Sequence, residues 1–284
     1  MAWFQVDFFS NTLHRRVPLN VLIPADALGM PLDPNAKYPT LYLLHGYVGN
    51  CDDWLLGAGV EQLANLLKVA IVMPSGNNDF YVDAPRSEKN QSTYLAGELI
   101  DFTRRTFPLS DKREDTMIGG LSMGGFGALY NGLKHSEVFG KIVALSGPMH
   151  IMDKPNLDNL PDEPNFMGIT KGYYEELFGP LDKITGSCYD PKTVAKELAE
   201  SSRPRPEIYI ACGWNDELRA ANRDYSAYLE QLGIEHFYEE GPGSHEWAFW
   251  DPYLKKGLAH VMKKDLTPMP NPFWVEDDRP EERM

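Results

Sequence analysis

The sequence predicts an α/β fold, a mainly parallel central sheet with helices on both faces. Two observations carry this prediction. Short, continuous apolar runs recur along the chain, and segments of helical period lie between them. Strands that are apolar throughout are buried on both faces, which is typical of parallel sheets joined by crossover helices. Loops at the carboxyl ends of such strands hold the ligand, so a site is expected there.

The expected elements alternate along the chain. Strands are predicted at runs rich in Val, Ile, Leu and Tyr: 17–23, 40–44, 69–73, 116–119, 141–145, 207–211 and 236–238. Apolar residues at helical spacing predict helices between them: Tyr94, Leu95, Leu99 and Phe102, and later Leu218, Ala221, Tyr225, Leu229 and Leu232. A last helix is expected after residue 245.

We expect one domain over residues 1–265. Within it, residues 147–202 hold many Pro, Asp and Asn residues with scattered aromatics and little periodicity, which indicates an irregular insertion over the site. An ordinary long surface loop is the alternative interpretation. Residues 266–284 are rich in proline and acidic residues and predict an extended C-terminal arm.

Composition and charge exclude several classes of protein. Hydrophobic residues make up 43% of the 284 residues and charged residues 24%, as in soluble globular chains. The net charge of -14 repels phosphate backbones and anionic lipids, so neither nucleic acid nor a membrane is an expected partner. No apolar run approaches the ~18 residues of a membrane span, and the N-terminus lacks the apolar core of a secretory signal, which predicts a cytoplasmic location. The three cysteines have no C-x-x-C spacing and indicate neither disulfides nor a zinc site.

The most informative segment is 116–129. A short predicted strand runs into Gly120, Leu121, Ser122, Met123 and Gly124 and then into a helix of small residues. This G-x-S-x-G pattern between strand and helix is typical of a nucleophile whose backbone is strained and whose flanking glycines remove colliding side chains. The turn exposes Ser122 near a helix N-terminus, which favours developing negative charge. The pattern is weak by itself, so the assignment depends on its context.

A serine hydroxyl requires a general base, and in this fold the chain order is serine, acid, histidine. His245 follows the predicted strand 236–238 and lies in a glycine-rich loop before an apolar helix. It is the best-placed base. The other downstream histidines are assigned surface or packing roles, because they lie on helices, in a strand or at the start of the insertion: His135, His150, His236 and His260.

The acid is expected at the end of the strand before the one that leads to His245. Asp216 lies in the turn after the predicted strand 207–211, where its carboxylate would hold the histidine tautomer and stabilise the imidazolium. Glu217 and Asp224 are the alternatives. The non-catalytic interpretation of Asp216 is an N-cap for the helix that starts near Leu218.

Acyl transfer also requires amide donors for the tetrahedral oxyanion. The Met123 amide, directly after the nucleophile, is the first candidate. The second is expected in the loop 44–50, where a buried strand ends in His-Gly and the amide of Tyr47 points inward, with Gly46 as a further candidate. The oxyanion loop, the nucleophile, the acid and the base occur in the expected order along the chain. Their combination is far more specific than any one of them.

With these parts in place, the chain resembles the esterase D type of α/β hydrolase over nearly its whole length. That group holds short-chain acyl esterases such as tributyrin esterases, feruloyl and acetyl xylan esterases, and S-formylglutathione hydrolases. The resemblance implies the α/β-hydrolase fold and the same nucleophile, acid and base. It implies no metal and no organic cofactor. The segments that carry it are 4–10, 44–50 with Trp54, 119–129, 212–216 and 241–250.

The resemblance predicts a serine carboxylic ester hydrolase that cleaves short-chain acyl esters through an acyl-enzyme on Ser122. One alternative is a feruloyl or acetyl xylan esterase that acts on plant cell-wall oligosaccharides. Tyr47, Val48 and Gly49 depart from the Leu-Thr-Cys that glutathione thioester hydrolases carry, which disfavours the S-formylglutathione-type thioesterase. A non-catalytic binding scaffold on the same fold is a further alternative.

Tryptophans near these motifs are candidates for an acyl or aromatic pocket, although core or interface positions account for them equally well. These candidates are Trp54, Trp214 and Trp247, with Trp250 beside them. The expected partner is a small-molecule or oligosaccharide ester. Members of the group form dimers or tetramers, so the resemblance leaves a homo-oligomer open.

Overall fold

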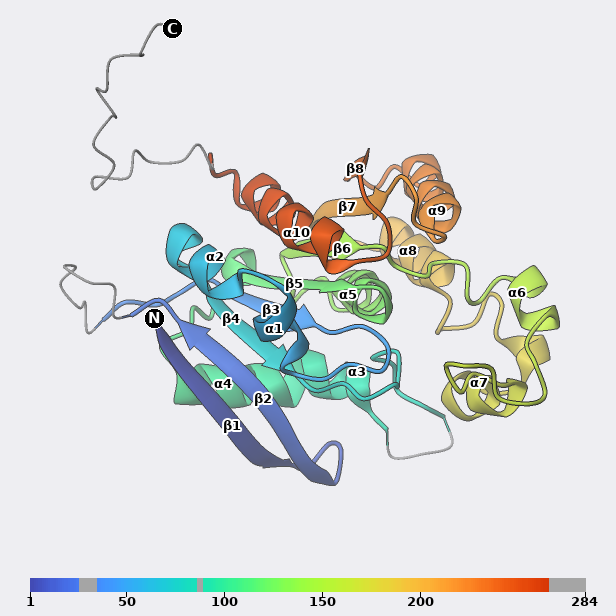
Figure 1. Ribbon diagram of the computed structural model, residues 1–284, viewed down its shortest axis with the longest axis horizontal. Coiled ribbons are helices and arrows are strands. Elements are labelled where there is room, and N and C mark those ends of the chain that lie inside the picture. Colours follow the sequence, from blue (N-terminus) through green and yellow to red (C-terminus); the bar gives the residue numbers. More distant parts are fainter. Residues whose placement is uncertain (26–34, 86–88, 266–284) are drawn as a thin grey trace, which may run out of the picture.

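The computed structural model describes residues 1–25, 35–85 and 89–265. Within these ranges eight strands form one sheet, in the order β1-β2-β4-β3-β5-β6-β7-β8 (Figure 1). The first two strands form an antiparallel hairpin, and β2 pairs antiparallel with β4. All later neighbours are parallel. This mostly parallel sheet confirms the predicted fold class; the predicted arm at 266–284 lies outside the described residues.

The strands begin and end close to the predicted apolar runs. Only the first was not predicted. It lies at an edge of the sheet and is mostly exposed, and its apolar residues alternate with polar ones over Phe4–Phe8, a pattern that the search for continuous apolar runs did not select. The eight are β1 (Ala2–Ser10), β2 (Arg15–Ile23), β3 (Thr40–Leu44), β4 (Ala70–Pro74), β5 (Thr116–Leu121), β6 (Lys141–Leu145), β7 (Glu207–Gly213) and β8 (Phe237–Gly241).

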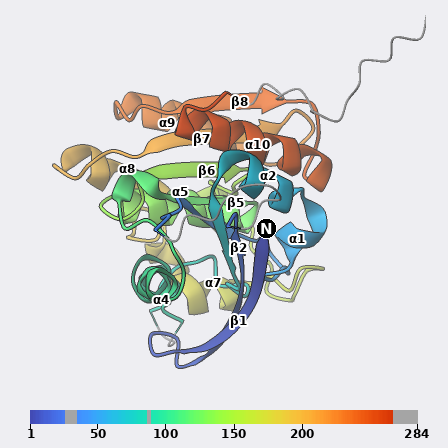
Figure 2. The same cartoon turned by 90° about the vertical axis from the view of Figure 1, so that its left-hand side faces the viewer.

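Two hydrophobic cores lie on opposite faces of the sheet, because successive side chains of a strand point to opposite sides. Tyr42 of β3 belongs to the core shared with α4 (Leu99–Thr106), α5 (Met123–Lys134), α8 (Pro191–Glu200) and α9 (Arg219–Gln231). Its neighbours Leu41 and Leu43 belong to the core shared with α1 (Asp53–Gly57), α2 (Val60–Leu67) and α10 (Trp247–Met262). In Figure 2, α4 and α8 lie on one side of the strands and α1 and α2 on the other.

The predicted helix around residues 94–102 is continuous but not uniform. It opens with α3 (Gln91–Thr93), passes through a π-helical turn at η1 (Tyr94–Glu98) and continues as α4. A short 3-10 turn, η2 (Arg113–Asp115), precedes β5. No helix in the described residues is both long and apolar enough to cross a bilayer.

Residues 147–202 are less irregular than the sequence predicts. They contain α6 (Lys154–Asp158), α7 (Lys171–Phe178), the 3-10 turn η3 (Leu181–Lys183) and α8. Thr170 and Asp190 cap α7 and α8, each accepting a backbone N–H of the first turn. Helices α6 and α7 are too short to show a clear period, which explains why the sequence did not reveal them. Figure 1 shows both projecting from one end of the molecule.

Candidate active site

Ser122 lies at the junction of β5 and α5, where the chain reverses within one residue. Its φ is 53°, a strained conformation for a residue other than glycine. The reversal brings the turn Gly120–Gly124, called the elbow below, against the end of β3. A Cβ on Gly120 would lie 2.8 Å from the Leu44 carbonyl oxygen, and a Cβ on Gly124 would lie 2.6 Å from the His45 carbonyl oxygen. The amide of Ser122 donates to the Leu145 carbonyl of β6 at 2.9 Å. Steric crowding therefore requires both glycines of the motif.

His245, on the loop between β8 and α10, faces the serine. Its Nε2 lies 2.9 Å from Ser122 Oγ, and its Nδ1 lies 3.0 Å from Asp216 Oδ2. With an ionised carboxylate at Nδ1, that nitrogen carries the proton and Nε2 is left to accept the serine hydroxyl. The structure thus brings together three residues that are far apart in the sequence, in the geometry of a nucleophile, a base and an orienting acid.

The side chain of Asp216 is fully buried at the end of β7. Burial by itself raises the pKa of this carboxyl, but hydrogen bonds from His245, Ser146 and the Leu218 amide outweigh it and hold the pKa below its ordinary value. The Leu218 amide donates to Oδ1 at 2.9 Å. Asp216 is therefore not the N-cap of α9, which is Leu218, but one of its oxygens holds the turn that precedes the helix while the other faces the histidine.

The loop after β3 forms a tight turn beside the serine. The Gly49 amide donates to the Gly46 carbonyl at 3.2 Å, and Val48 has a φ of 61°. A Cβ on Gly46 would lie 3.5 Å from the Cβ of Ser122 and 2.8 Å from Leu121 Cδ1, so the loop approaches the elbow at a glycine. Tyr47 and Met123 both border the pocket that contains Ser122. The Met123 amide opens α5, where the first turn offers no intrahelical acceptor.

Side chains that the sequence did not single out hold this loop in place. Buried His45 donates from Nδ1 to the Gly46 carbonyl at 2.7 Å and accepts the Gly76 amide at Nε2 at 2.9 Å. Burial lowers its pKa, which keeps the imidazole neutral and suits one donating and one accepting nitrogen. The Asn78 side chain accepts the Val48 amide at 2.8 Å. The His-Gly dipeptide was the only sequence signal for this support, and it indicated a turn.

A pocket of about 510 Å³ opens at Ser122 and His245. Residues 148–174 supply much of its wall, so the segment 147–202 lies against the site. Most of its lining residues are apolar or aromatic: Tyr47, Phe80, Met123, Pro148, Ile151, Leu160, Pro161, Phe166, Met167, Ile169, Tyr174 and Leu218. His150, which was assigned a surface or packing role, and Glu217, one of the alternative acids, border it as well. The segment has no clear periodicity, so these residues could not be chosen from the sequence.

The three candidate tryptophans do not line this pocket. Trp54 is buried and donates its indole N–H to the Leu44 carbonyl at 2.9 Å. Trp247 packs edge-on against Trp54, with 5.2 Å between ring centroids, and Trp214 is half exposed at 52%. Trp54 and Trp247 serve the core between α1 and α10, because large apolar rings gain most from full burial.

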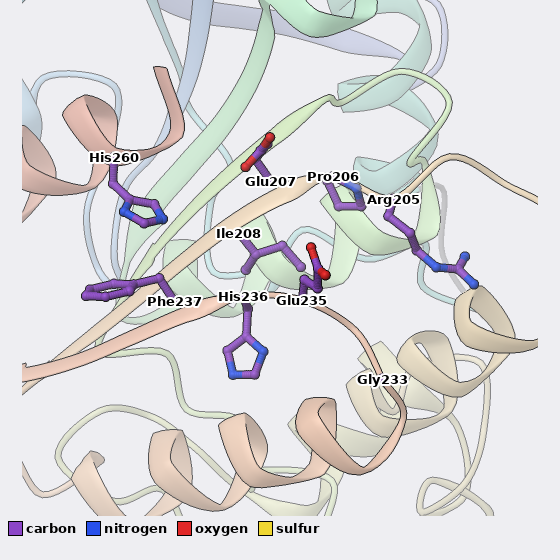
Figure 3. A pocket seen from close by; sticks show the side chains of 9 residues that line it. All are labelled: Arg205, Pro206, Glu207, Ile208, Gly233, Glu235, His236, Phe237 and His260. Carbon is purple, nitrogen blue, oxygen red and sulfur yellow. The ribbon is translucent and has the colours of Figure 1, made fainter. Parts of the chain in front are cut away.

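The remaining histidines lie away from Ser122, except His150. His135 pairs with Ser92 at 3.0 Å, and the His260 ring packs on Phe237 with 4.7 Å between centroids. His236 and His260 border a second pocket, of about 480 Å³, at the amino ends of β7 and β8 (Figure 3). In the described part of the chain, no group of three or more His, Cys, Asp or Glu residues could hold a metal ion.

Comparison with known proteins places this geometry in a family. The Esterase family, described as "Putative esterase", matches residues 10–261. An acetyl esterase from Caldicellulosiruptor saccharolyticus is 38% identical over 266 residues, which cover 93% of this chain and 99% of the relative.

Two solved structures from Staphylococcus aureus are similar as well. The fluorophosphonate-binding serine hydrolase F has 29% identity and a TM-score of 0.78, covering 92% of this chain and 98% of its own. An S-formylglutathione hydrolase has 27% identity and a TM-score of 0.75 with the same coverage.

Proposed function

The chain belongs to the Esterase family and is an esterase, and we propose that it hydrolyses short-chain acyl esters through an acyl-enzyme on Ser122. One observation carries this proposal: an unbroken line of hydrogen bonds from Ser122 through His245 to Asp216, open to a pocket at the serine end. The serine then has a base within reach, and the base has a buried carboxylate behind it. The likeness to a serine hydrolase that binds fluorophosphonates supports the choice of nucleophile.

In the acylation half of the reaction, Ser122 Oγ attacks the ester carbonyl carbon and its proton passes to His245 Nε2. The carbonyl oxygen becomes an oxyanion, and in this proposal the backbone amides of Met123 and Tyr47 donate hydrogen bonds to it. Collapse of this intermediate breaks the bond between the acyl carbon and the alcohol oxygen. His245 gives its proton to the departing alcohol, and the acyl group stays on Ser122.

In the deacylation half of the reaction, water takes the place of the alcohol and the acylation steps run in reverse. His245 Nε2 accepts a proton from water, the hydroxide oxygen bonds to the acyl carbon, and the Ser122 ester bond breaks with return of the proton to Oγ. Asp216 remains ionised throughout and stabilises the imidazolium of each transition state. The products are one carboxylic acid and one alcohol, so no redox partner or cofactor enters the balance.

The pocket wall favours an apolar acyl group. Phe80, Met123 and Ile151 border it near the serine, and burial of such a group gains about 0.8 kcal/mol for each CH₂ removed from water. The relative from Caldicellulosiruptor saccharolyticus is named for acetyl esters, the shortest members of this substrate class.

The test is a pre-steady-state measurement with p-nitrophenyl acetate and p-nitrophenyl butyrate. We expect a burst of p-nitrophenol equal to the enzyme concentration, or fast steady turnover where deacylation keeps pace. Ser122→Ala should abolish the burst and lower kcat by orders of magnitude with an unchanged circular dichroism spectrum. Retained hydrolysis in that variant would refute the assignment of Ser122.

An aromatic acyl group is the second candidate, because the pocket volume of about 510 Å³ exceeds what an acetyl group fills. Tyr47, Phe80 and Tyr174 supply aromatic faces to its wall. Methyl ferulate distinguishes the two substrates. A kcat/KM for methyl ferulate above that for p-nitrophenyl butyrate, after allowance for the better leaving group of the latter, would assign the enzyme to aromatic esters.

A further inference from the structure

Residues 76–81, which follow β4, contact both the loop after β3 and α7. Three of them have left-handed backbone conformations, with a φ of 50° at Asn77, 48° at Phe80 and 57° at Tyr81. Residues other than glycine keep such conformations only where their surroundings hold them, and they cluster at functional sites. Tyr81 is fully buried, and its carbonyl accepts the Asn131 side-chain amide of α5 at 2.9 Å. The segment is therefore fixed to the body of the protein.

This segment holds the loop after β3 at two points. At the start of the loop, the Tyr81 hydroxyl donates to the His45 carbonyl at 3.0 Å. Further along, the Val48 amide donates to Asn78 Oδ1 at 2.8 Å. The second point lies one residue after Tyr47, whose amide is the proposed donor to the oxyanion.

Val48 requires such an anchor. Its φ of 61° is unfavourable for a β-branched residue, and it is 76% exposed, so packing does little to hold it there. The half-buried Asn78 side chain instead fixes the peptide between Tyr47 and Val48. The Tyr47 amide is joined to that peptide through the two backbone dihedral angles of Tyr47. Release of the peptide would therefore let the amide turn as well.

Helix α7 holds Asn78 from the other side. The Tyr173 hydroxyl donates to the Asn78 carbonyl at 2.5 Å, and the Tyr173 ring packs edge-on against Tyr47 with 6.1 Å between centroids. The next residue of α7, Tyr174, borders the pocket that contains the nucleophile. Asn78 thus joins the loop after β3, through its side chain, to a wall of the pocket, through its carbonyl.

We propose that Asn78, held by Tyr173, is a positioning residue that keeps the Tyr47 amide directed at the oxyanion. This inference rests on the proposed function, in which that amide donates to the tetrahedral intermediate. Because the oxyanion forms only along the reaction and not in the bound ester, loss of the anchor should lower kcat more than it changes KM. Among the described residues, Asn78 does not line the pocket, so substrate binding should change little.

The first test removes the Asn78 side chain. Asn78→Ala should lower kcat for p-nitrophenyl acetate about tenfold, with KM within about twofold. Removal of an oxyanion donor itself costs about 100-fold or more, but here the amide remains and is only less often in place. A trifluoromethyl ketone, which Ser122 converts to a hemiketal oxyanion, should bind about tenfold more weakly. Unchanged kcat and inhibition would overturn the proposal, whatever the loss of stability.

The second test asks whether Asn78 acts through Val48. Glycine adopts a positive φ without strain, so a loop with Val48→Gly depends less on the anchor. In that background Asn78→Ala should lower kcat less than about threefold. An equal tenfold loss in both backgrounds would refute the positioning role. If Asn78→Ala does not fold, Asn78→Ser replaces it, because its shorter side chain also gives up the bond; a wild-type kcat there would count against the proposal.

The third test concerns α7. Tyr173→Phe removes the hydroxyl that bonds Asn78 and keeps the ring against Tyr47, so kcat should fall about threefold with little change in KM. Tyr225→Phe is the matched control, because its hydroxyl donates to the Pro191 carbonyl at 3.0 Å, between α9 and α8, and kcat should not change. Equal kcat in the two variants would contradict the role of Tyr173.

The same measurements separate the two proposals. Retained turnover in Ser122→Ala would contradict the proposed function itself. Loss of turnover in Ser122→Ala, combined with full kcat in Asn78→Ala, would leave that function intact and remove only the role of Asn78.

Discussion

The two ends of the sheet each present a pocket and a serine–histidine pair. At the carboxyl end, Ser122 and His245 lie 2.9 Å apart beside a pocket of about 510 Å³. At the amino end, Ser226 and His236 lie 2.7 Å apart, and His236 borders a pocket of about 480 Å³ (Figure 3). The two pockets are similar in volume, and the two serine–histidine pairs are similar in hydrogen-bond length.

The surroundings of each pair make the difference. His245 Nδ1 faces the carboxylate of Asp216, whereas His236 Nδ1 faces the Ile234 carbonyl at 2.9 Å. A neutral carbonyl fixes a tautomer but stabilises an imidazolium far less than a carboxylate does. Ser226 lies inside α9, where backbone amides are engaged in the helix, whereas Ser122 precedes the first turn of α5. A serine beside a histidine is therefore not a catalytic site without a charged partner and free amide donors.

The sharpest test of this comparison replaces one histidine at each end. His245→Ala should lower kcat for p-nitrophenyl acetate by about 10⁴-fold or more, because the serine loses its base. His236→Ala should change kcat by less than about twofold and lower the free energy of unfolding by about 1 kcal/mol, the usual contribution of one hydrogen bond. Steady-state kinetics and urea unfolding measure both. A comparable loss of kcat in the two variants would remove the distinction between the two ends.

Replacement of the acid should have the next largest effect. Asp216→Asn should reduce kcat by about 10⁴-fold, because an amide favours the histidine tautomer whose Nε2 cannot accept the serine proton. Asp224→Asn, on α9, is the matched control and should leave kcat unchanged. Single-turnover kinetics with p-nitrophenyl butyrate separate the acylation rate from binding. Equal activity of the two variants would show that Asp216 serves only the turn before α9.

Crowding at the elbow gives a smaller, structural effect. A methyl group at Gly124 meets the carbonyl oxygens of Leu44 and His45, which are backbone atoms and cannot turn aside. Gly124→Ala should therefore move the elbow away from the loop after β3. We expect kcat/KM to fall about 100-fold and the free energy of unfolding to fall by about 1 to 3 kcal/mol. At Gly97 nothing lies within 4 Å of an added Cβ, and Gly97→Ala should raise stability by about 0.5 to 1 kcal/mol. Unchanged kinetics in Gly124→Ala would contradict the steric account of the elbow.

The smallest effect concerns pH and His45. Burial holds its pKa below the ordinary value of 6.5, so below pH 6.5 the unfolded chain binds a proton that the folded protein does not. Stability should therefore fall as the pH drops through 6.5 toward the folded-state pKa, by at most about 1.4 kcal/mol per pH unit for this one group. His45→Gln should flatten that dependence relative to the wild type. Urea unfolding between pH 7.5 and 5 measures it, and identical slopes in the two proteins would exclude the contribution of His45.

Sequence reasoning reached the fold because the inner parallel strands β3, β4 and β6 are almost wholly apolar, and these strands begin and end close to the predicted apolar runs. It missed β1, which alternates apolar and polar residues at the edge of the sheet and so forms no continuous apolar run, and the short helices of residues 147–202, which offer few turns in which a period can be seen. The assignment of Trp54 and Trp247 to a substrate pocket illustrates a further limit. Their place in the chain, beside the site motifs, is equally compatible with a core position, and the packing of α1 against α10 decides for the core.

The sequence by itself determined the reactive residue types and their order along the chain. Two of these features depend on only a few consecutive residues and are therefore visible in the sequence. They are the steric exclusion at Gly120 and Gly124 and the apolar character of the inner strands. Only the tertiary structure decided which groups meet: that Asp216 serves the turn before α9 and the histidine at once, that His45 holds the loop after β3, and that Phe80 and Tyr174 border one pocket. These contacts join segments far apart in the chain, and burial and hydrogen-bond geometry at such junctions arise only when the strands and helices pack.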